Sequence, residues 1–233
     1  MKRIKFFIGA VLMAVVTMFA AGCEQDNAEP TNVSDNTTTA DWVDLGLPSG
    51  LLWATRNVGA FSPTDYGDCF AWGETQQKDN YSWETYRYGS GWNQLTKYCN
   101  DGSYGYNGFT DNLRTLTSDD DAAAVNVPGS RMPTRDEWKE LVEKCTWDWT
   151  TQNRVNGYRV TGPNGNVLFL PAAGSCWGGS AYEVGGRGYY WSSSLDEVYP
   201  YNAWDLGFGS GDVGWRSGDR YGGFSVRPVR SAR

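Results

Sequence analysis

The chain has 233 residues, a formal net charge of −7 and no histidine. The acidic balance argues against a protein that neutralises nucleic-acid phosphates. The lack of histidine excludes Ser-His-Asp triads, Cys-His dyads and His-ligated metal sites. The length suits one or two domains, and the 29 glycines, 12 tryptophans and 14 tyrosines indicate a loop-rich fold with many large aromatic side chains.

Residues 1–22 have the pattern of a secretion signal. Lys2, Arg3 and Lys5 form a basic start, and the apolar run from Phe6 to Ala21 is short for a membrane span. The run ends in Ala20-Ala21-Gly22-Cys23, with small residues directly before a cysteine, as in a bacterial lipobox. We therefore predict lipidation of Cys23 and attachment to a membrane through it. An ordinary signal cleaved near Ala21 is the alternative.

Residues 23–40 are polar, and residues 41–233 carry the apolar patterns of a folded domain. The polar segment is predicted to be a flexible tether, because it could not bury enough apolar surface to offset the entropy of ordering it. In the domain, Leu51–Ala54 reads as a short buried strand and Phe70–Gly73 as a short apolar piece. Residues 76–112 show no periodicity and are expected to form long ordered loops.

Two helices are predicted after these loops. Ser118 is the expected N-cap of a helix that continues to Val125, with acidic residues in its first turn. The second begins with a capping box from Thr134 to Glu137. Apolar residues then follow at helical spacing, so one helix face should meet the core; they are Trp138, Leu141, Val142 and Cys145.

The remaining sequence predicts strands. Residues 157–161 and 167–170 flank a Gly-Pro-Asn-Gly turn and predict a hairpin. Further strands are expected at 189–193, 203–208, 213–215 and 224–229. The alternation over 203–208 places Trp204, Leu206 and Phe208 on one face. The whole pattern predicts an α+β domain with two helices, antiparallel sheets and long ordered loops.

Several residues are candidates for covalent, metal or acid–base chemistry. Four cysteines besides Cys23 allow disulfides in an exported protein, but the sequence does not choose among three pairings or exclude free thiols; they are Cys69, Cys99, Cys145 and Cys176. Asp119-Asp120-Asp121 could ligate calcium, although helix capping is the better interpretation, and no metal or cofactor is expected. Seven acidic residues are candidates for a carboxylate pair in a glycoside hydrolase; they are Glu74, Glu84, Asp136, Glu137, Glu183, Asp205 and Asp212. Nothing in the sequence pairs them, so no enzyme is predicted.

The C-terminal composition is more informative. Residues 177–224 are rich in Gly, Tyr, Ser and Asp with interspersed Trp and Arg, a combination typical of binding surfaces. We expect the loops within 182–221 to bind a protein or glycan ligand, while Trp191 and Trp204 belong to the scaffold. The alternative is that these residues only form turns and fill a small core. The predicted contacts are Tyr182, Tyr199, Tyr201, Asn202, Trp215, Arg216, Asp219, Arg220 and Tyr221.

Short motifs spread over residues 41–230 resemble the Fibrobacter major paralogous domain family, which is abundant in Bacteroidetes lipoproteins. Examples are Val43-Asp44-Leu45-Gly46-Leu47-Pro48-Ser49-Gly50, Phe70-Ala71-Trp72-Gly73-Glu74, Arg131-Met132-Pro133-Thr134, Tyr190-Trp191-Ser192-Ser193-Ser194 and Ser225-Val226-Arg227-Pro228-Val229. The resemblance implies a C-type lectin-like fold related to formylglycine-generating enzymes. The copper-binding cysteine pair of those enzymes and the calcium motifs of sugar-binding lectins are absent, so neither activity carries over.

The resemblance also suggests how the protein is used. Some relatives with this C-terminal pattern are variable proteins of diversity-generating retroelements, and residues 196–223 are similar to them in composition. The acidic run after Cys23 resembles the surface-export signal of Bacteroidetes lipoproteins. We therefore expect a lipid-anchored outer-membrane protein, exposed at the cell surface, that binds a ligand. The alternatives are a structural or adhesive lipoprotein without a selected pocket and a carbohydrate-active hydrolase.

Overall fold

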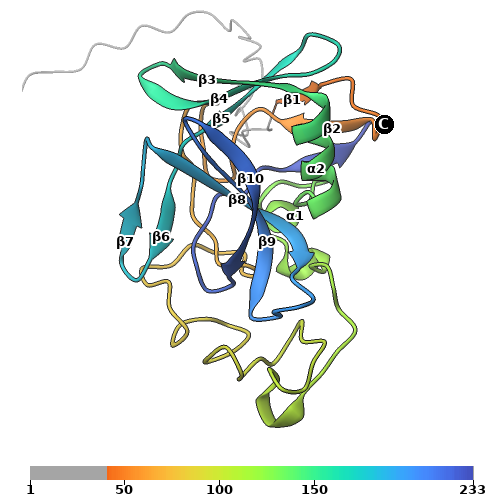
Figure 1. Ribbon diagram of the computed structural model, residues 1–233, viewed down its shortest axis with the longest axis vertical. Coiled ribbons are helices and arrows are strands. Elements are labelled where there is room, and N and C mark those ends of the chain that lie inside the picture. Colours follow the sequence, from red (N-terminus) through yellow and green to blue (C-terminus); the bar gives the residue numbers. More distant parts are fainter. Residues whose placement is uncertain (1–40, 233) are drawn as a thin grey trace, which may run out of the picture. The chain divides into compact units, whose positions relative to one another are not determined.

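The computed structural model describes residues 41–232 (Figure 1). The predicted signal, the tether and Cys23 lie outside this range, as does residue 233. The described chain forms mostly antiparallel strands in four small sheets, with two α-helices, which is compatible with the predicted α+β class. None of the helices within residues 41–232 combines the length and apolar character needed to cross a membrane.

The first sheet joins the two ends of the described chain. It has the order β1-β2-β11, with β1 at Trp42–Asp44, β2 at Leu51–Ala54 and β11 at Val229–Ser231. The predicted strand at Leu51–Ala54 is confirmed. The strand expected at 224–229 is wrong in extent, because regular pairing starts only at Val229, after a proline that has no N–H to donate. Phe224 and Ser225 form isolated bridges instead.

The second sheet carries the C-terminal hairpin. Its order is β10-β9-β8, with β8 at Arg187–Leu195, β9 at Asn202–Gly209 and β10 at Asp212–Asp219. All three predicted strands are confirmed and are longer than expected. In β9 and β10, Trp215 lies opposite Leu206, Arg216 opposite Asp205 and Asp219 opposite Asn202. Residues that lie opposite each other share a face of the sheet. Side chains alternate between the two faces along a strand, so neighbouring positions along β10 point to opposite faces.

The third sheet has the order β3-β4-β5, with β3 at Thr146–Gln152, β4 at Val155–Thr161 and β5 at Val167–Pro171. The predicted β4–β5 hairpin is confirmed, but β3 was not anticipated. The turn between β3 and β4 contains Asn153 and Arg154, both with positive φ. Hairpin turns with positive φ usually contain glycine, and without a glycine this turn could not be recognised from the sequence. A fourth sheet pairs β6 (Ser175–Trp177) with β7 (Ser180–Tyr182).

The two helices differ in how well the sequence predicted them. Helix α2 (Arg135–Lys144) begins with the predicted capping box between Thr134 and Glu137. The first helix was placed wrongly, because Ser118 starts only the 3-10 turn η2 (Ser118–Asp120). Helix α1 (Ala122–Asn126) is capped by Asp121, whose carboxylate accepts hydrogen bonds from the amides of Ala123 and Ala124 at 2.8 and 3.1 Å. A carboxylate at this position satisfies amides that the helix leaves unpaired.

The core consists of two groups of buried apolar side chains, one around Trp72 and Trp191 and the other around Trp53 and Trp138. Trp191 is fully buried, as predicted, and donates its indole N–H to the carbonyl of Phe70 at 2.7 Å. Trp204 is only half-buried, which corrects its assignment to the core. It lies near the start of β9, where the Arg135 guanidinium covers its ring at 3.7 Å.

A long loop (residues 55–117) connects β2 to η2 and contains isolated bridges and the 3-10 turn η1 (Tyr106–Gly108). The expectation of long loops over 76–112 is therefore confirmed. A disulfide joins Cys69 of this loop to Cys176 of β6, 107 residues away, while Cys99 and Cys145 are free thiols. In Figure 1 the later, yellow-to-green part of the long loop lies beyond the end of the second sheet at which β9 begins.

Candidate ligand-binding surface

Four aromatic side chains from two distant segments meet at the surface and are called here the aromatic patch. Trp92 and Tyr104 come from the long loop, and Tyr199 and Tyr201 from the turn between β8 and β9. The ring centroid of Tyr201 lies 5.5 Å from that of Tyr104, 5.9 Å from that of Tyr199 and 6.3 Å from that of Trp92. Trp92 is 55% exposed and Tyr199 48% exposed. The patch is thus a continuous aromatic surface in contact with solvent.

The turn that carries Tyr199 and Tyr201 is held by the buried carboxylate of Asp196. One oxygen accepts hydrogen bonds from the amides of Val198 and Tyr199 at 3.0 and 3.2 Å. The other oxygen accepts a hydrogen bond from the Ser217 hydroxyl of β10. The amide of Asn202 closes the turn by donating to the Tyr199 carbonyl at 2.7 Å. These bonds fix the two tyrosines in place before any ligand arrives.

Arg220 was predicted to be an exposed contact, and this is wrong because its side chain is 0% exposed. Its guanidinium donates hydrogen bonds to the carbonyls of Lys97, Tyr98 and Pro200 at 3.0, 3.1 and 2.9 Å. It also donates to the Tyr86 hydroxyl at 2.8 Å. The planar group, with its five fixed donors, can reach several carbonyls at once. Arg220 therefore joins the long loop to the turn that bears the patch tyrosines, and is a positioning residue.

Asp219 and Tyr221 continue the surface beyond the patch. Asp219 lies opposite Asn202 at the end of the β9–β10 hairpin, and the Tyr221 hydroxyl hydrogen-bonds its carboxyl group. Burial raises the pKa of Asp219, and the bond to Tyr221 opposes that change. The Tyr221 ring packs between Trp83 and Trp177, with centroids 5.0 and 5.4 Å away. This second aromatic group is less exposed than the patch.

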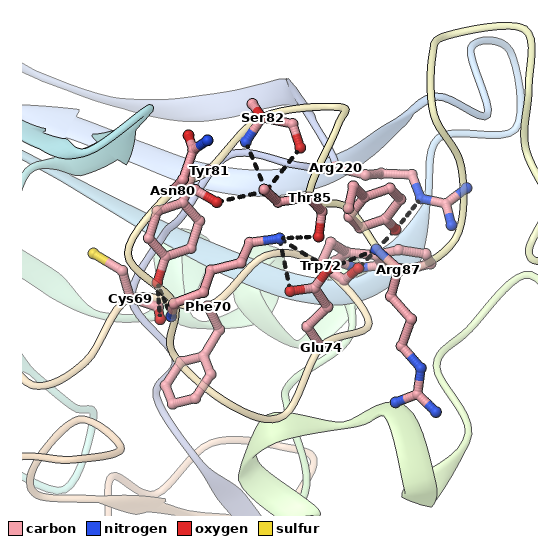
Figure 2. Close-up of polar contacts among 12 residues, drawn as sticks. Cys69, Phe70, Trp72, Glu74, Asn80, Tyr81, Ser82, Thr85, Arg87 and Arg220 are labelled. Carbon is pink, nitrogen blue, oxygen red and sulfur yellow. Dashed lines mark hydrogen bonds and ion pairs between the residues drawn. The ribbon is translucent and has the colours of Figure 1, made fainter.

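The part of the long loop that bears Trp83 is fixed by polar contacts around Glu74 (Figure 2). The Glu74 carboxylate accepts hydrogen bonds from the Lys78 ammonium at 3.0 Å and from the Arg87 amide at 2.8 Å. Lys78 also donates to the carbonyl of Thr85 at 3.1 Å. The Tyr81 hydroxyl donates to the carbonyl of Cys69, the disulfide-bonded residue, at 2.6 Å. The loop is therefore anchored on both sides of Trp83.

Three predicted contacts lie elsewhere. Arg216 occupies the face of β10 opposite to Ser217 and Asp219, and forms an ion pair with Asp212 at 3.3 Å. Its side chain crosses Gly207, where a side chain of any other residue would collide with it. Trp215 is half-buried against the core around Trp53. Tyr182 is exposed, but it lies on β7, whose only partner in its sheet is β6.

Several acidic candidates for calcium binding or catalysis are engaged in other ways. Asp120 accepts hydrogen bonds from the hydroxyls of Tyr88 and Tyr98 and from Lys97. Glu137 pairs with Arg131, and Glu183 with Arg187. Within residues 41–232 no group of three or more Cys, Asp or Glu side chains is arranged to hold a metal ion. Asp205 is the exception, since neither of its buried oxygens has a hydrogen-bond partner.

The structure thus brings together five of the predicted contacts and adds two that the sequence did not indicate. Tyr199, Tyr201, Asn202, Asp219 and Tyr221 gather around the start of β9 and the end of β10. The additional residues, Trp92 and Tyr104, lie in a stretch of the long loop that is rich in Gly, Tyr and Ser, as the C-terminal segment is. That shared composition was the one available signal. Comparisons with family models, curated proteins and solved structures found no match to this chain.

Proposed function

We propose that this protein binds a ligand and that the aromatic patch is its principal contact surface. The observation that carries the proposal is a surface cluster of four aromatic rings, in which Tyr201 contacts the other three and Trp92 and Tyr199 are exposed. Two of the four rings come from a turn fixed by Asp196 and Arg220. Tyrosine and tryptophan contribute large contact areas at low cost in side-chain entropy, and they are the residues that most often dominate binding energy. A surface already held in place also loses less freedom when a ligand binds.

The proposed setting is the outer surface of a bacterial cell, with the domain attached through a lipid on Cys23. The small residues before Cys23 and the acidic run after it support this location. Replacement of Cys23 by Ala should abolish labelling of the protein by a palmitate analogue in growing cells. Undiminished labelling of the variant would contradict the lipid anchor and leave the binding proposal standing.

The proposed fold family is the C-type lectin-like group, and the proposed source of variation is a diversity-generating retroelement. The ordered series of short motifs over residues 41–230 and the composition of 196–223 support both. Sequencing the gene and its neighbourhood tests the second point. A template repeat beside a reverse-transcriptase gene is the expected finding, and its absence from the locus would exclude diversification at this gene.

Binding itself is tested with the purified full-length protein on a glycan array and against a library of displayed random peptides. Replacing Trp92 or Tyr201 by Ala should lower the affinity for any ligand found in this way by at least about tenfold. Phe61→Ala is the matched control, because Phe61 is another exposed aromatic residue and is outside the patch. Binding that survives both patch substitutions would instead favour a structural or adhesive protein without this contact surface.

A further inference from the structure

The rings of the aromatic patch are tilted against one another. Trp92 stands at 77° to Tyr201 and 72° to Tyr104, and the rings of Tyr104 and Tyr201 are inclined at 48°. The patch therefore offers no strip of coplanar ring faces on which the sugar rings of an extended glycan would stack in succession. It offers several ring faces in different directions, and the face of each ring carries the negative part of its quadrupole, which attracts cations.

Two acidic side chains, Asp219 and Asp196, lie close enough to Tyr201 to influence its hydroxyl. Asp219 lies at the end of β10, where the amide of the next residue, Arg220, donates to the Tyr201 carbonyl at 3.1 Å. Burial, followed by the charges of neighbouring groups that include Asp219 and Asp196, raises the pKa of the Tyr201 hydroxyl. Glu197 is exposed two residues before Tyr199, but Arg114 offsets its charge, so Asp219 and Asp196 are the acids that matter here. The potential at the patch is thus negative, as is the formal charge of the whole chain.

The cations next to the patch are engaged elsewhere. Lys97 is paired with Asp120, and Arg114 forms an ion pair with Glu197 at 3.6 Å. Arg220 is buried, and its guanidinium is directed at backbone carbonyls and the Tyr86 hydroxyl. A second copy of this acidic chain would bring more negative charge to the same place. The complementary ligand is therefore cationic and is not another copy of the protein.

The patch is an exposed surface, and the domain's cavities of about 260 Å³ lie elsewhere, one beside Asn57 and Pro228 and the other beside Met132 and Ser193. Enclosed pockets suit small molecules, whereas an open surface suits the protruding side chains of another macromolecule. The domain already stacks guanidinium groups on half-buried rings: Arg135 covers Trp204 at 3.7 Å and Arg230 covers Trp42 at 4.4 Å. The same chemistry is available on the unoccupied ring faces of the patch.

We infer that the ligand is a protein and that it contacts the patch through a segment bearing arginine or lysine. The cationic side chain lies against the faces of Trp92, Tyr104 and Tyr201, and Asp219 supplies the opposing charge. This inference rests on the proposed function, because it assigns a ligand class to the same surface. Arginine is the better fit, since its planar group stacks on aromatic rings while keeping its donors free for a carboxylate.

The test is selection of displayed random peptides on the immobilised full-length protein, followed by affinity measurements with synthetic copies of the selected peptides. Selected sequences should be enriched in Arg and Lys compared with the starting library. Replacing the key arginine by citrulline, which keeps the shape and removes the charge, should weaken binding at least about tenfold. Asp219→Asn should weaken the arginine peptide and leave the citrulline peptide unchanged. Raising the ionic strength should weaken the arginine peptide only.

The outcomes separate this inference from the proposed function. Peptides without a basic bias, equal binding of the citrulline peptide, or glycans bound through the patch would each overturn the cationic ligand while the patch remained a binding surface. Binding that is unaffected by Trp92→Ala and Tyr201→Ala, or no binder of either class, would overturn both. Phe61→Ala again serves as the control and should leave every affinity unchanged.

Discussion

Replacement of Asp205 by Asn should stabilise the protein at neutral and alkaline pH and remove much of its pH dependence. Asp205 is 0% exposed in the middle of β9, and neither carboxyl oxygen has a hydrogen-bond partner. Burial raises the pKa of this carboxyl to about 7, although the positive charge of Arg216, directly opposite on β10, acts to lower it. The ionised side chain is therefore the unfavourable form in the folded state.

The magnitude follows from the difference between the folded and unfolded states. The ordinary pKa is 3.8, so the folded protein holds this proton more tightly than the unfolded chain does. The contribution of Asp205 to the free energy of unfolding is fully present below pH 3.8. It falls as the pH rises from about 4 to about 7, and does not change further above about pH 7. Since each pH unit in this window is worth about 1.4 kcal/mol, the loss amounts to about 4 kcal/mol.

Urea unfolding of both proteins over a series of pH values measures this effect. The Asp205→Asn variant should be more stable above neutral pH by up to about 4 kcal/mol, and nearly equal to the native protein at acidic pH. Asp148→Asn, on the exposed side of β3, is the matched control and should leave the profile unchanged. Parallel profiles for the native protein and Asp205→Asn would show that this carboxyl is not the source of the pH dependence and would refute the reasoning.

Three further outcomes are expected in unfolding experiments. Arg220→Ala should lower the free energy of unfolding by about 3 kcal/mol or more, because three carbonyls lose their donor. Arg220→Lys should regain little of this stability, and a fully stable Lys variant would show that the positive charge alone suffices. Trp191→Ala should cost about 3–5 kcal/mol and Trp92→Ala less than about 1 kcal/mol, and similar losses for both would contradict the division between core and surface. Replacing Cys69 and Cys176 together by Ala should lower the free energy of unfolding by about 4 kcal/mol, since their disulfide closes a loop of 107 residues. Cys145 is a free thiol, so a Cys145→Ala variant should still lose stability in a reducing agent, as the native protein does.

The elements that the sequence predicted correctly are those specified by neighbouring residues. The capping box of Thr134 and Glu137 and the Gly-Pro-Asn-Gly turn before β5 lie within a few residues of the structure that they determine. Strand β3 was missed because Asn153 and Arg154 in its turn have positive φ. Residues other than glycine rarely adopt this backbone conformation, so the sequence does not indicate a turn there. Local patterns therefore predicted helix α2 and strands β4, β5, β8, β9 and β10, but not β3, β6 or β7.

The candidate site depends on contacts that no local pattern contains. Tyr199 and Tyr201 could be proposed from their composition, but Trp92 and Tyr104 join them only through the folding of the long loop. Arg220 stands in a polar, loop-like sequence that predicts exposure, and it is buried because carbonyls more than 100 residues away need donors. The periodicity of apolar residues in the sequence cannot predict that a charged residue is buried by hydrogen bonds to residues far along the chain.

The two buried arginines near the C-terminus also affect when the chain can fold. Arg227 donates to the Ala54 carbonyl and the Asn57 side chain, 173 and 170 residues earlier, and Arg220 reaches Tyr86, 134 residues earlier. Strand β11 likewise completes the sheet that β1 and β2 begin. During synthesis, the early loops therefore remain without these donors until Arg220 and Arg227 have emerged. Contacts of such long sequence separation form slowly, so we expect the early loops to fold late, after the C-terminal strands have been made.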